Sequence, residues 1–495
     1  MQLIVRRDIS CGAPVRTRRS SFVAASSPTV FKHRVLMTTP AFSQPTTERL
    51  TVMGAGLVGS LLSLYLARRG HAVEVFERRG DPRRAGFQEG RSINLALSDR
   101  GWKALGGVGV ANDIRQVGIP MNGRVMHDVH GNLTRQPYGH EGQAIYSVNR
   151  GHLNRRLLDL AEGQTGVTLH FGQQCLGIDL KAKALHLRDS ETQQEHTAPY
   201  TRLFGTDGAF SAVRSALQRT DRFDFSQDFL NYGYKELTIA AGPDGAWQLE
   251  KNALHIWPRG QYLMIALPNL DGSFNATLFF PYEGPESFAA LQTPADVTAF
   301  FDRVFPDAVP LMPALTEEFF AHPTGSLLTI RCFPWKFNDD VLLLGDAAHA
   351  IVPFYGQGMN AGFEDCTVLN ALFDEHGDAA WATIFAEFQA LRKPNNDAMA
   401  DLALYNFVEM RDRVADPSFL LQKKIEAKIS ARFPGQWVPL YSQVTFSDTP
   451  YAEAWAAGQR QDAIMARLMP HIQAEADFDQ PAVQALVQQE MAARH

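Results

Sequence analysis

The sequence predicts an α/β fold, in which a Rossmann-like dinucleotide-binding domain is interleaved with an antiparallel-sheet domain and followed by a C-terminal helical region. Three observations support this prediction. A strand, a glycine-rich turn, a helix and a second strand follow one another over residues 49–77. Two further apolar strands, near residues 204 and 343, each run into a turn that contains Asp and Gly. Strand-like runs separated by turns fill residues 233–281, and a helical pattern begins at Phe363.

Length and composition limit the class of protein. The chain has 495 residues, of which 45% are hydrophobic and 20% charged, as expected for a globular protein of two or three domains. The net charge of −6 provides no overall basic field, so we do not expect nucleic acid as a partner. The four cysteines show no C-x-x-C spacing, which predicts a reduced intracellular chain with neither a disulfide framework nor a metal site. No apolar run reaches the roughly 18 residues that cross a bilayer.

Residues 1–48 differ in composition from the rest of the chain. They are rich in Arg, Ser, Thr and Pro, and their only acidic residues are Asp8 and Glu48. We interpret them as a disordered leader, or as an extension ahead of a start near Met37, and we expect a cytoplasmic protein. Because Arg-rich, acid-poor N-termini are also typical of transit peptides, import into an organelle stays open as an alternative.

The first glycine-rich turn has the spacing of a dinucleotide-binding site. Gly54 permits the tight turn, Gly56 lets the backbone approach a pyrophosphate, and Gly59 allows the helix to pack closely on the strand. The helix N-terminus presents free N–H groups to the phosphates, and Glu77 at the end of the second strand can accept ribose hydroxyls. The residues expected to contact the dinucleotide here are Gly54, Gly56, Leu57, Val58, Gly59, Glu77 and Arg78.

Two further strand-turn motifs indicate which dinucleotide is bound. Asp207-Gly208 and Gly345-Asp346 each follow an apolar strand, and an Asp in that position can hold a ribityl hydroxyl. The glycine-rich stretch 356–362 opens a helix, whose N–H groups and dipole can face the pyrimidine end of a flavin. This field favours the anionic reduced ring and therefore promotes flavin reduction.

In this order, the three motifs resemble those of the FAD-binding aromatic hydroxylases, the single-component flavoprotein monooxygenases. The resemblance implies bound FAD, with NADPH and O₂ as co-substrates, and NADPH that docks transiently because the chain has one dinucleotide fingerprint. Further FAD contacts that it implies are Arg91, Arg150, Cys175, Asp207, Gly208, Asp346, Gly358, Met359 and Asn360. The chemistry is expected at the flavin, so no catalytic side chain is assigned.

Six further stretches within residues 50–467 resemble one enzyme of this family in particular. They are residues 90–98, 118–121, 255–259, 346–366, 405–411 and 438–441. This resemblance implies a small-molecule substrate, an amino acid with an aniline ring. The residues that it places at the substrate are Arg124, Tyr138, Asn406, Tyr441, Phe354 and Tyr355. Arg124 and Tyr138 would grip the carboxylate, because a guanidinium meets a carboxylate in two parallel charge-assisted bonds.

We expect five segments along the chain. They are the leader 1–48, the first part of the FAD-binding domain 49–225, the antiparallel-sheet substrate domain 226–335, the second part of the FAD-binding domain 336–375, and the C-terminal helical region 376–495. The predicted sheet carries many large side chains and can form one wall of an aromatic pocket. These side chains are Trp257, Tyr262, Met264, Phe279 and Phe280.

Two other functions stay open from the sequence. One is another hydroxylase of aromatic acids on the same fold. The other is a non-redox binding protein that keeps a flavin-type fold as a scaffold, although intact Asp207, Gly208, Gly345 and Asp346 favour an enzyme. The sequence also leaves a monomer and a homodimer open.

Overall fold

A six-stranded sheet carries the predicted dinucleotide-binding motif. The computed structural model describes residues 48–84, 94–138, 142–413 and 416–492. The sheet has the order β18-β19-β12-β1-β2-β8, and its strands are parallel except β18. Their bounds are β1 (Arg49–Met53), β2 (Ala72–Glu77), β8 (Val167–Phe171), β12 (Arg202–Gly205), β18 (Lys336–Phe337) and β19 (Val341–Leu343). The predicted strand, turn, helix and strand over residues 49–77 are therefore confirmed.

Helices and a smaller sheet surround these strands. The helices are α1 (Leu57–Arg68), α2 (Asp99–Gly107), α3 (Ala111–Arg115), α4 (Arg150–Glu162), α5 (Ala212–Leu217), α8 (Asp346–His349) and α9 (Gly358–His376). α1 packs against α4 and α9, and α2 also packs against α9. The smaller antiparallel sheet comprises β9 (Gln173–Asp179), β10 (Ala184–Asp189) and β11 (Glu195–Pro199). Central strands such as β1 and β19 are buried at nearly every position because both faces of a parallel sheet are covered.

A seven-stranded sheet forms the second layer, in the order β17-β13-β16-β15-β14-β5-β6. Its strands are β5 (Gly123–His127), β6 (Leu133–Pro137), β13 (Asp224–Ile239), β14 (Ala253–Pro258), β15 (Leu263–Pro268), β16 (Phe274–Pro281) and β17 (Gly325–Phe333). The predicted antiparallel sheet is present, but β5 and β6 extend it and come from the segment assigned to the FAD-binding domain. β5 pairs in parallel with β14, which lies far along the chain, and no local sequence pattern predicts such a pairing. The five segment boundaries stay predictions.

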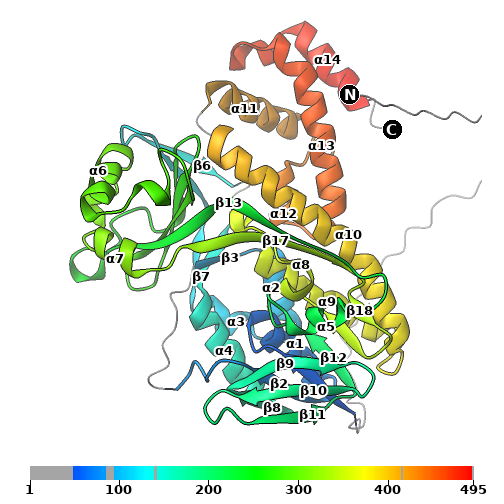
Figure 1. The fold of residues 1–495 in the computed structure, drawn as a ribbon. Coiled ribbons are helices and arrows are strands. Elements are labelled where there is room, and N and C mark those ends of the chain that lie inside the picture. The colour runs from blue at the N-terminus through cyan, green and yellow to red at the C-terminus, as the bar shows by residue number, and fades with distance from the viewer. Residues whose placement is uncertain (1–47, 85–93, 139–141, 414–415, 493–495) are drawn as a thin grey trace, which may run out of the picture. The chain divides into compact units, whose positions relative to one another are not determined.

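The two faces of this sheet contact different parts of the chain. One face packs on α6 (Pro294–Val304) and α7 (Leu315–Ala321), with Trp257 and Phe280 in the core between them. The other face meets the loop around Phe354 and helix α10 (Trp381–Val408). Figure 1 shows α6 and α7 together at one end of the long strands β13 and β17. A second small sheet is made of β3 (Asn94–Leu97), β7 (Ile145–Asn149) and β4 (Gly118–Met121).

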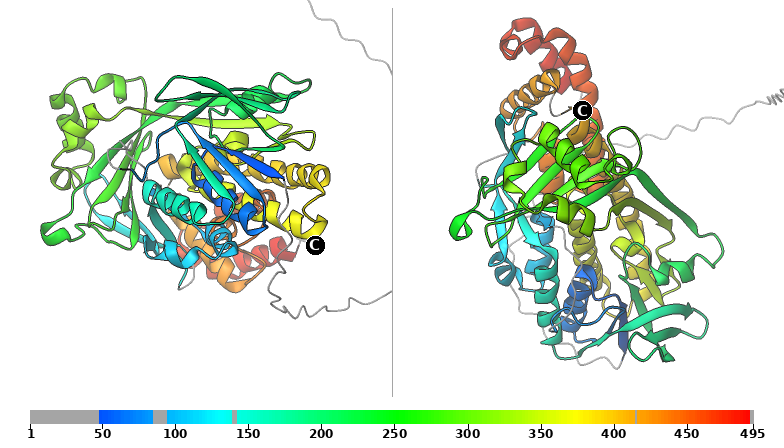
Figure 2. Two further views of the ribbon diagram at one scale, coloured as in Figure 1. Left: turned by 90° about the horizontal axis from the view of Figure 1, so that it is seen from below. Right: turned by 60° about the vertical axis from the view of Figure 1, so that its left-hand side comes forward.

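The chain after α9 is helical, as predicted. Its elements are α10 (Trp381–Val408), a π-helical turn η5 (Glu409–Arg413), α11 (Pro417–Arg432), α12 (Leu440–Thr445), α13 (Tyr451–Leu468) and α14 (Pro481–Ala492). α11, α13 and α14 share a small core of their own, and the right-hand view of Figure 2 shows them gathered together in orange and red. Within the described ranges, no helix is both long and apolar enough to span a membrane.

Candidate active site

A cavity of about 570 Å³ lies between the two large sheets. The β1–α1 turn, the ends of β2 and β12, and the N-terminus of α9 line one side of it. β14, β15 and β16 line the other side. Motifs that are about three hundred residues apart in the sequence therefore meet at one site.

Most of the residues predicted to contact the cofactor line this cavity. They are Gly54, Gly56, Leu57, Val58, Glu77, Arg78, Arg150, Cys175, Asp207, Gly208, Asp346, Gly358 and Met359. Gly59 and Asn360 are not among the lining residues, and Arg91 lies outside the described residues. The sequence motifs thus converge in space, while the contact of each residue with a cofactor stays a prediction.

The three glycines of the turn differ in what a Cβ atom at each position would contact. Gly54 has φ +101°, and a Cβ there would lie 2.6 Å from the carbonyl oxygen of Thr206. At Gly59 a Cβ would lie 1.9 Å from the carbonyl oxygen of Gly54. A Cβ on Gly56 would meet nothing within 4 Å. The fold itself therefore needs Gly54 and Gly59, whereas Gly56 leaves a space that a bound pyrophosphate can fill.

Glu77 holds the turn in place from the end of β2. Its Oε2 accepts a hydrogen bond from the N–H of Ala55 at 3.0 Å. Its Oε1 accepts from both the N–H and the Nε of Arg79, each at 3.0 Å. Arg78, Arg79 and Arg150 also line the cavity, and their positive charge suits an anionic cofactor.

Asp207 and Asn360 have different roles. Oδ2 of Asp207 accepts from the N–H groups of Ala212 at 2.7 Å and Val213 at 3.2 Å, while its Oδ1 is buried without a partner among the described residues. Burial raises the pKa of Asp207. A ribityl hydroxyl would satisfy this oxygen. Asn360 instead ties the glycine-rich loop to β3, because its Oδ1 accepts from the N–H of Ser98 at 2.9 Å and its Nδ2 donates to the carbonyl of Ala96 at 2.8 Å.

A second cavity of about 210 Å³ adjoins the first one. Four of the predicted substrate residues, Arg124, Tyr355, Asn406 and Tyr441, line both cavities. Phe354 lines the first alone, and Tyr138 lines the second alone. The predicted substrate residues therefore form the boundary between two chambers.

Arg124 occupies this boundary with unused hydrogen-bonding capacity. Its Nε and the hydroxyl of Tyr138 are buried without a hydrogen-bond partner in the part of the chain that the structure describes. The guanidinium carbon lies 4.5 Å from the ring centre of Tyr441, which stacks on Tyr138 at 5.2 Å. Burial by itself would lower the pKa of Arg124, but the two tyrosines and Glu409 raise it overall, so the group is cationic. A buried cation and a hydroxyl side by side suit a carboxylate ligand.

The sheet forms a cavity wall, as predicted, but mainly with other residues. Of the large side chains singled out from the sequence, Phe279 lines the cavity, whereas Trp257, Tyr262, Met264 and Phe280 pack on the opposite face against α6 and α7. Successive residues of a strand point to opposite faces, so the wall is formed by alternate positions. The selection of large side chains from the sequence missed four other residues of this wall, which are Leu254, Ile265, Leu267 and Thr277.

Sequence reasoning also missed the charged residues of the second cavity. Glu409, Lys423, Glu426 and Asp462 line it, from η5, α11 and α13. Nζ of Lys423 lies 3.2 Å from Glu426 and 3.6 Å from Glu409. Glu409 lies within the stretch 405–411 that carried the family resemblance, which was the one available signal. No sequence signal pointed to Lys423, Glu426 or Asp462.

Asn406 supports the loop that closes the first cavity. Its Nδ2 donates to the carbonyl oxygen of Phe354 at 2.7 Å, and the Phe354 ring stacks on Phe407 at 4.0 Å between ring centres. The side chain therefore positions Phe354 as well as facing the boundary between the chambers.

Comparison with known proteins agrees with this site. A family model described as "FAD binding domain" matches residues 46–258 and 328–403. A kynurenine 3-monooxygenase of Flavobacterium johnsoniae is 51% identical over 89% of this chain and 98% of the relative. One from Myxococcus xanthus is 50% identical over 88% and 94%. The tetrameric form of 2-methyl-3-hydroxypyridine-5-carboxylic acid oxygenase shares the fold, with a TM-score of 0.62 at 18% identity over 76% of this chain and 95% of that one.

The fold, the cavity lined by the dinucleotide-binding motifs and the family match define an FAD-dependent monooxygenase. This result decides between the enzyme and the non-redox binding protein in favour of the enzyme, which takes a small molecule as its substrate. Within this class, the chain belongs to the kynurenine 3-monooxygenase family.

Proposed function

We propose that this enzyme hydroxylates L-kynurenine at ring carbon 3, a step of tryptophan degradation. One L-kynurenine, one NADPH, one proton and one O₂ give 3-hydroxykynurenine, NADP⁺ and water. The observation that carries the proposal is the buried, cationic Arg124 beside the hydroxyl of Tyr138, which has no hydrogen-bond partner among the described residues, where the first and second cavities meet. The names of its relatives support the same substrate.

The motif residues would hold FAD along the first cavity. The β1–α1 turn would hold the pyrophosphate, Glu77 the adenosine ribose, Asp207 and Asp346 the ribityl chain, and the N-terminus of α9 the pyrimidine ring. FAD held there would supply the redox chemistry of the reaction, which is acceptance of a hydride from NADPH and activation of O₂ for hydroxylation of an aromatic ring. The protein supplies placement, charge and exclusion of water.

The two chambers match the two ends of L-kynurenine. Its aromatic ring would lie in the first cavity among Ile265, Phe279 and Phe354. Its carboxylate would bind Arg124 and Tyr138 at the boundary. The ammonium group sits on the next carbon, and we place it toward Glu409 in the second cavity, because that carboxylate is close enough to affect the pKa of Arg124. The bound zwitterion then adds no net charge to the buried site.

The walls of the first cavity would protect the reaction from water. The amine ortho to carbon 3 makes the ring electron-rich, so a dry, well-placed ring matters more than a general base. The apolar side chains of β14 to β16 provide this surface opposite the flavin-binding motifs. We also propose a cytoplasmic location, which rests on the composition of the chain, while a monomer and a homodimer both stay open.

Anaerobic stopped-flow reduction tests the proposal. The purified FAD enzyme is mixed with NADPH, with and without L-kynurenine, and then with O₂, and the products are identified. We expect L-kynurenine to accelerate bleaching of the flavin and O₂ to yield 3-hydroxykynurenine. Equal reduction rates with H₂O₂ as the main product would contradict the assigned substrate, and a panel of other aromatic acids would then be tested.

A further inference from the structure

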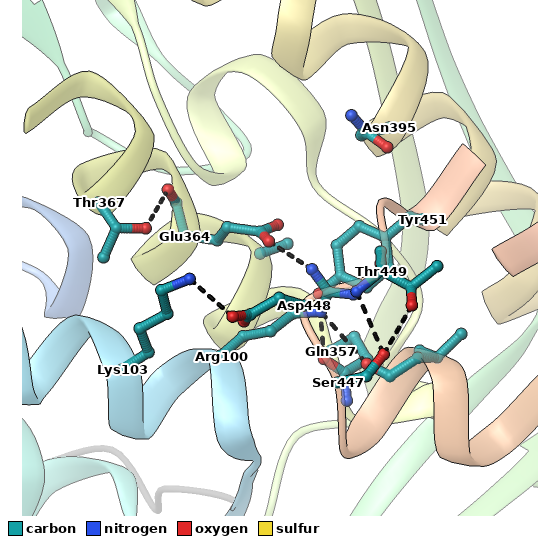
Figure 3. Close-up of polar contacts among 12 residues, drawn as sticks. Arg100, Lys103, Gln357, Glu364, Thr367, Asn395, Ser447, Asp448, Thr449 and Tyr451 are labelled. Atoms are coloured by element: carbon teal, nitrogen blue, oxygen red, sulfur yellow. Dashed lines mark hydrogen bonds and ion pairs between the residues drawn. The ribbon is translucent and has the colours of Figure 1, made fainter. Parts of the chain in front are cut away.

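The side chain of Arg100 is buried and joins three elements that lie far apart in the sequence. It starts at the first turn of α2 and is 1% exposed. Its Nε donates to the carbonyl oxygen of Val444 at 3.2 Å, and its two terminal nitrogens donate to Glu364 of α9 and to the carbonyl oxygen of Thr449. The ring of Tyr451 covers the guanidinium carbon at 4.1 Å. Figure 3 shows Glu364, Thr449 and Tyr451 around Arg100.

These bonds fix the short helix α12 from its C-terminal end. The carbonyl of Val444 belongs to the last turn of α12, where carbonyl groups lack partners within the helix. A cation at this end also interacts favourably with the helix dipole. Because a helix of six residues is marginal by itself, the position of α12 depends on such tertiary contacts.

α12 in turn carries Tyr441 to the boundary between the two cavities. Tyr441 precedes Val444 by three residues, which is about one turn of helix. Its ring stacks on Tyr138 and, at 5.7 Å between ring centres, on Tyr355. A displacement of α12 would therefore change the shape of the substrate chamber and open it to water.

The same cluster reaches the flavin side of the cavity. The hydroxyl of Tyr451 donates to Oε1 of Gln357 at 3.1 Å, immediately before the N-terminus of α9. Glu364 also binds Arg392 at 2.6 Å, and Arg392 binds Asp365 at 2.7 Å. The two arginines and two carboxylates balance in charge, as buried ions require.

We propose that Arg100 is a positioning residue that holds α12 against α9 and thereby keeps the substrate chamber closed to water during hydroxylation. The inference rests on the proposed function. Without this contact, NADPH, a proton and O₂ give NADP⁺ and H₂O₂, and the aromatic substrate is left unchanged. The planar guanidinium carries donors on three separate nitrogens, each of which reaches a different acceptor here, whereas the donors of an ammonium group all sit on one nitrogen.

Two variants of Arg100 and a matched control test this role. Arg100→Lys keeps the positive charge but loses the planar guanidinium and its donors on three nitrogens. Arg100→Gln removes the charge, and Glu364 still keeps Arg392 as its partner. The control is Lys103→Met, because Lys103 lies on the same helix and its 2.7 Å ion pair with Asp448 is exposed, at 60% and 63%. Each protein is assayed for bound FAD, for 3-hydroxykynurenine formed per NADPH oxidised, and for hydrogen exchange of residues 440–451.

We expect both Arg100 variants to retain FAD, to form at least about threefold less product per NADPH with matching H₂O₂, and to exchange residues 440–451 faster, while Lys103→Met matches the unmodified enzyme. If the FAD-loaded variants are only less heat-stable, with unchanged product per NADPH and unchanged exchange, Arg100 has a purely structural role and the inference is wrong. If one variant does not fold, the other decides. If the unmodified enzyme forms no 3-hydroxykynurenine, the proposed function fails instead.

Discussion

Arg124 carries a buried positive charge whose Nε has no hydrogen-bond partner among the described residues. We expect Arg124→Ala to raise KM for L-kynurenine roughly 30- to 140-fold, because losing charge-assisted bonds to a carboxylate costs about 2–3 kcal/mol. Bound FAD should be unchanged. Steady-state kinetics and the flavin absorbance of the purified variant measure the two effects.

Arg135→Ala is the matched control for this change. Arg135 lies on β6, beside β5, and forms an exposed ion pair with Glu250 at 3.0 Å. Its removal should leave KM for L-kynurenine equal to that of the unmodified enzyme within experimental error, since exposed ion pairs contribute little to stability. An unchanged KM in Arg124→Ala would remove Arg124 from the substrate site.

Glu409 is the residue that we expect to distinguish amino acids from simple acids. Glu409→Gln should raise KM for L-kynurenine by about tenfold, the effect of losing one charge-assisted bond of about 1.5 kcal/mol. KM for the analogue without the α-amino group should not change, because that ligand has no ammonium to bind. Parallel kinetics with the two compounds measure the difference. Equal increases for both would place the ammonium elsewhere.

At the scale of elements, the β1–α1 turn separates what the fold needs from what the cofactor needs. Gly56→Ala adds a Cβ that meets no protein atom within 4 Å, so we expect a normal far-ultraviolet circular dichroism spectrum. The added methyl would intrude on the pyrophosphate, and we expect FAD affinity to fall at least about tenfold. Flavin titration of the apoprotein measures this affinity.

Gly106→Ala, at an exposed glycine of α2 with equally open space, serves as its control and should bind FAD normally. Gly59→Ala should instead impair folding, because its Cβ would collide with the carbonyl of Gly54. Full FAD affinity in Gly56→Ala would show that the pyrophosphate does not approach this turn.

At the scale of the whole molecule, a buried histidine pair joins β5 to β14 and makes stability depend on pH. Nε2 of His127 lies 2.9 Å from Nδ1 of His255, and Nδ1 of His127 lies 2.6 Å from Asp307. Burial, together with the adjacent His127, lowers the pKa of His255 to about 4 from an ordinary value of 6.5. Trp257 donates to the same oxygen of Asp307 at 2.9 Å.

The sign of the effect follows from the lowered pKa. Below about pH 6.5, His255 is protonated in the unfolded chain but stays neutral in the folded protein. The free energy of unfolding therefore decreases as the pH falls toward 4. We expect a loss of about 2 kcal/mol in the free energy of unfolding between pH 7 and pH 5. The variant His255→Gln should not show this loss of unfolding free energy between pH 7 and pH 5. The control His130→Gln, at an exposed turn, should show the same loss as the unmodified protein. Urea unfolding at the two pH values measures it, and equal pH dependence in all three proteins would contradict it.

The sequence by itself determined the motifs whose chemistry is local. A glycine turn, a strand ending in Asp and a helix opening with glycines can each be recognised because their spacing reflects backbone geometry within a few residues. The antiparallel strands of 253–281 and the helices after Phe363 also follow from local periodicity.

Tertiary structure alone decided which residues of distant segments meet. The parallel pairing of β5 with β14 places Arg124 beside the sheet wall, and the alternation of β15 and β16 turns Ile265 and Phe279, rather than Met264 and Phe280, toward the cavity. The second chamber and the contacts of Arg100 depend on packing between helices far apart in the chain. Such contacts leave no periodic trace in a single sequence, because each partner is specified only by the other.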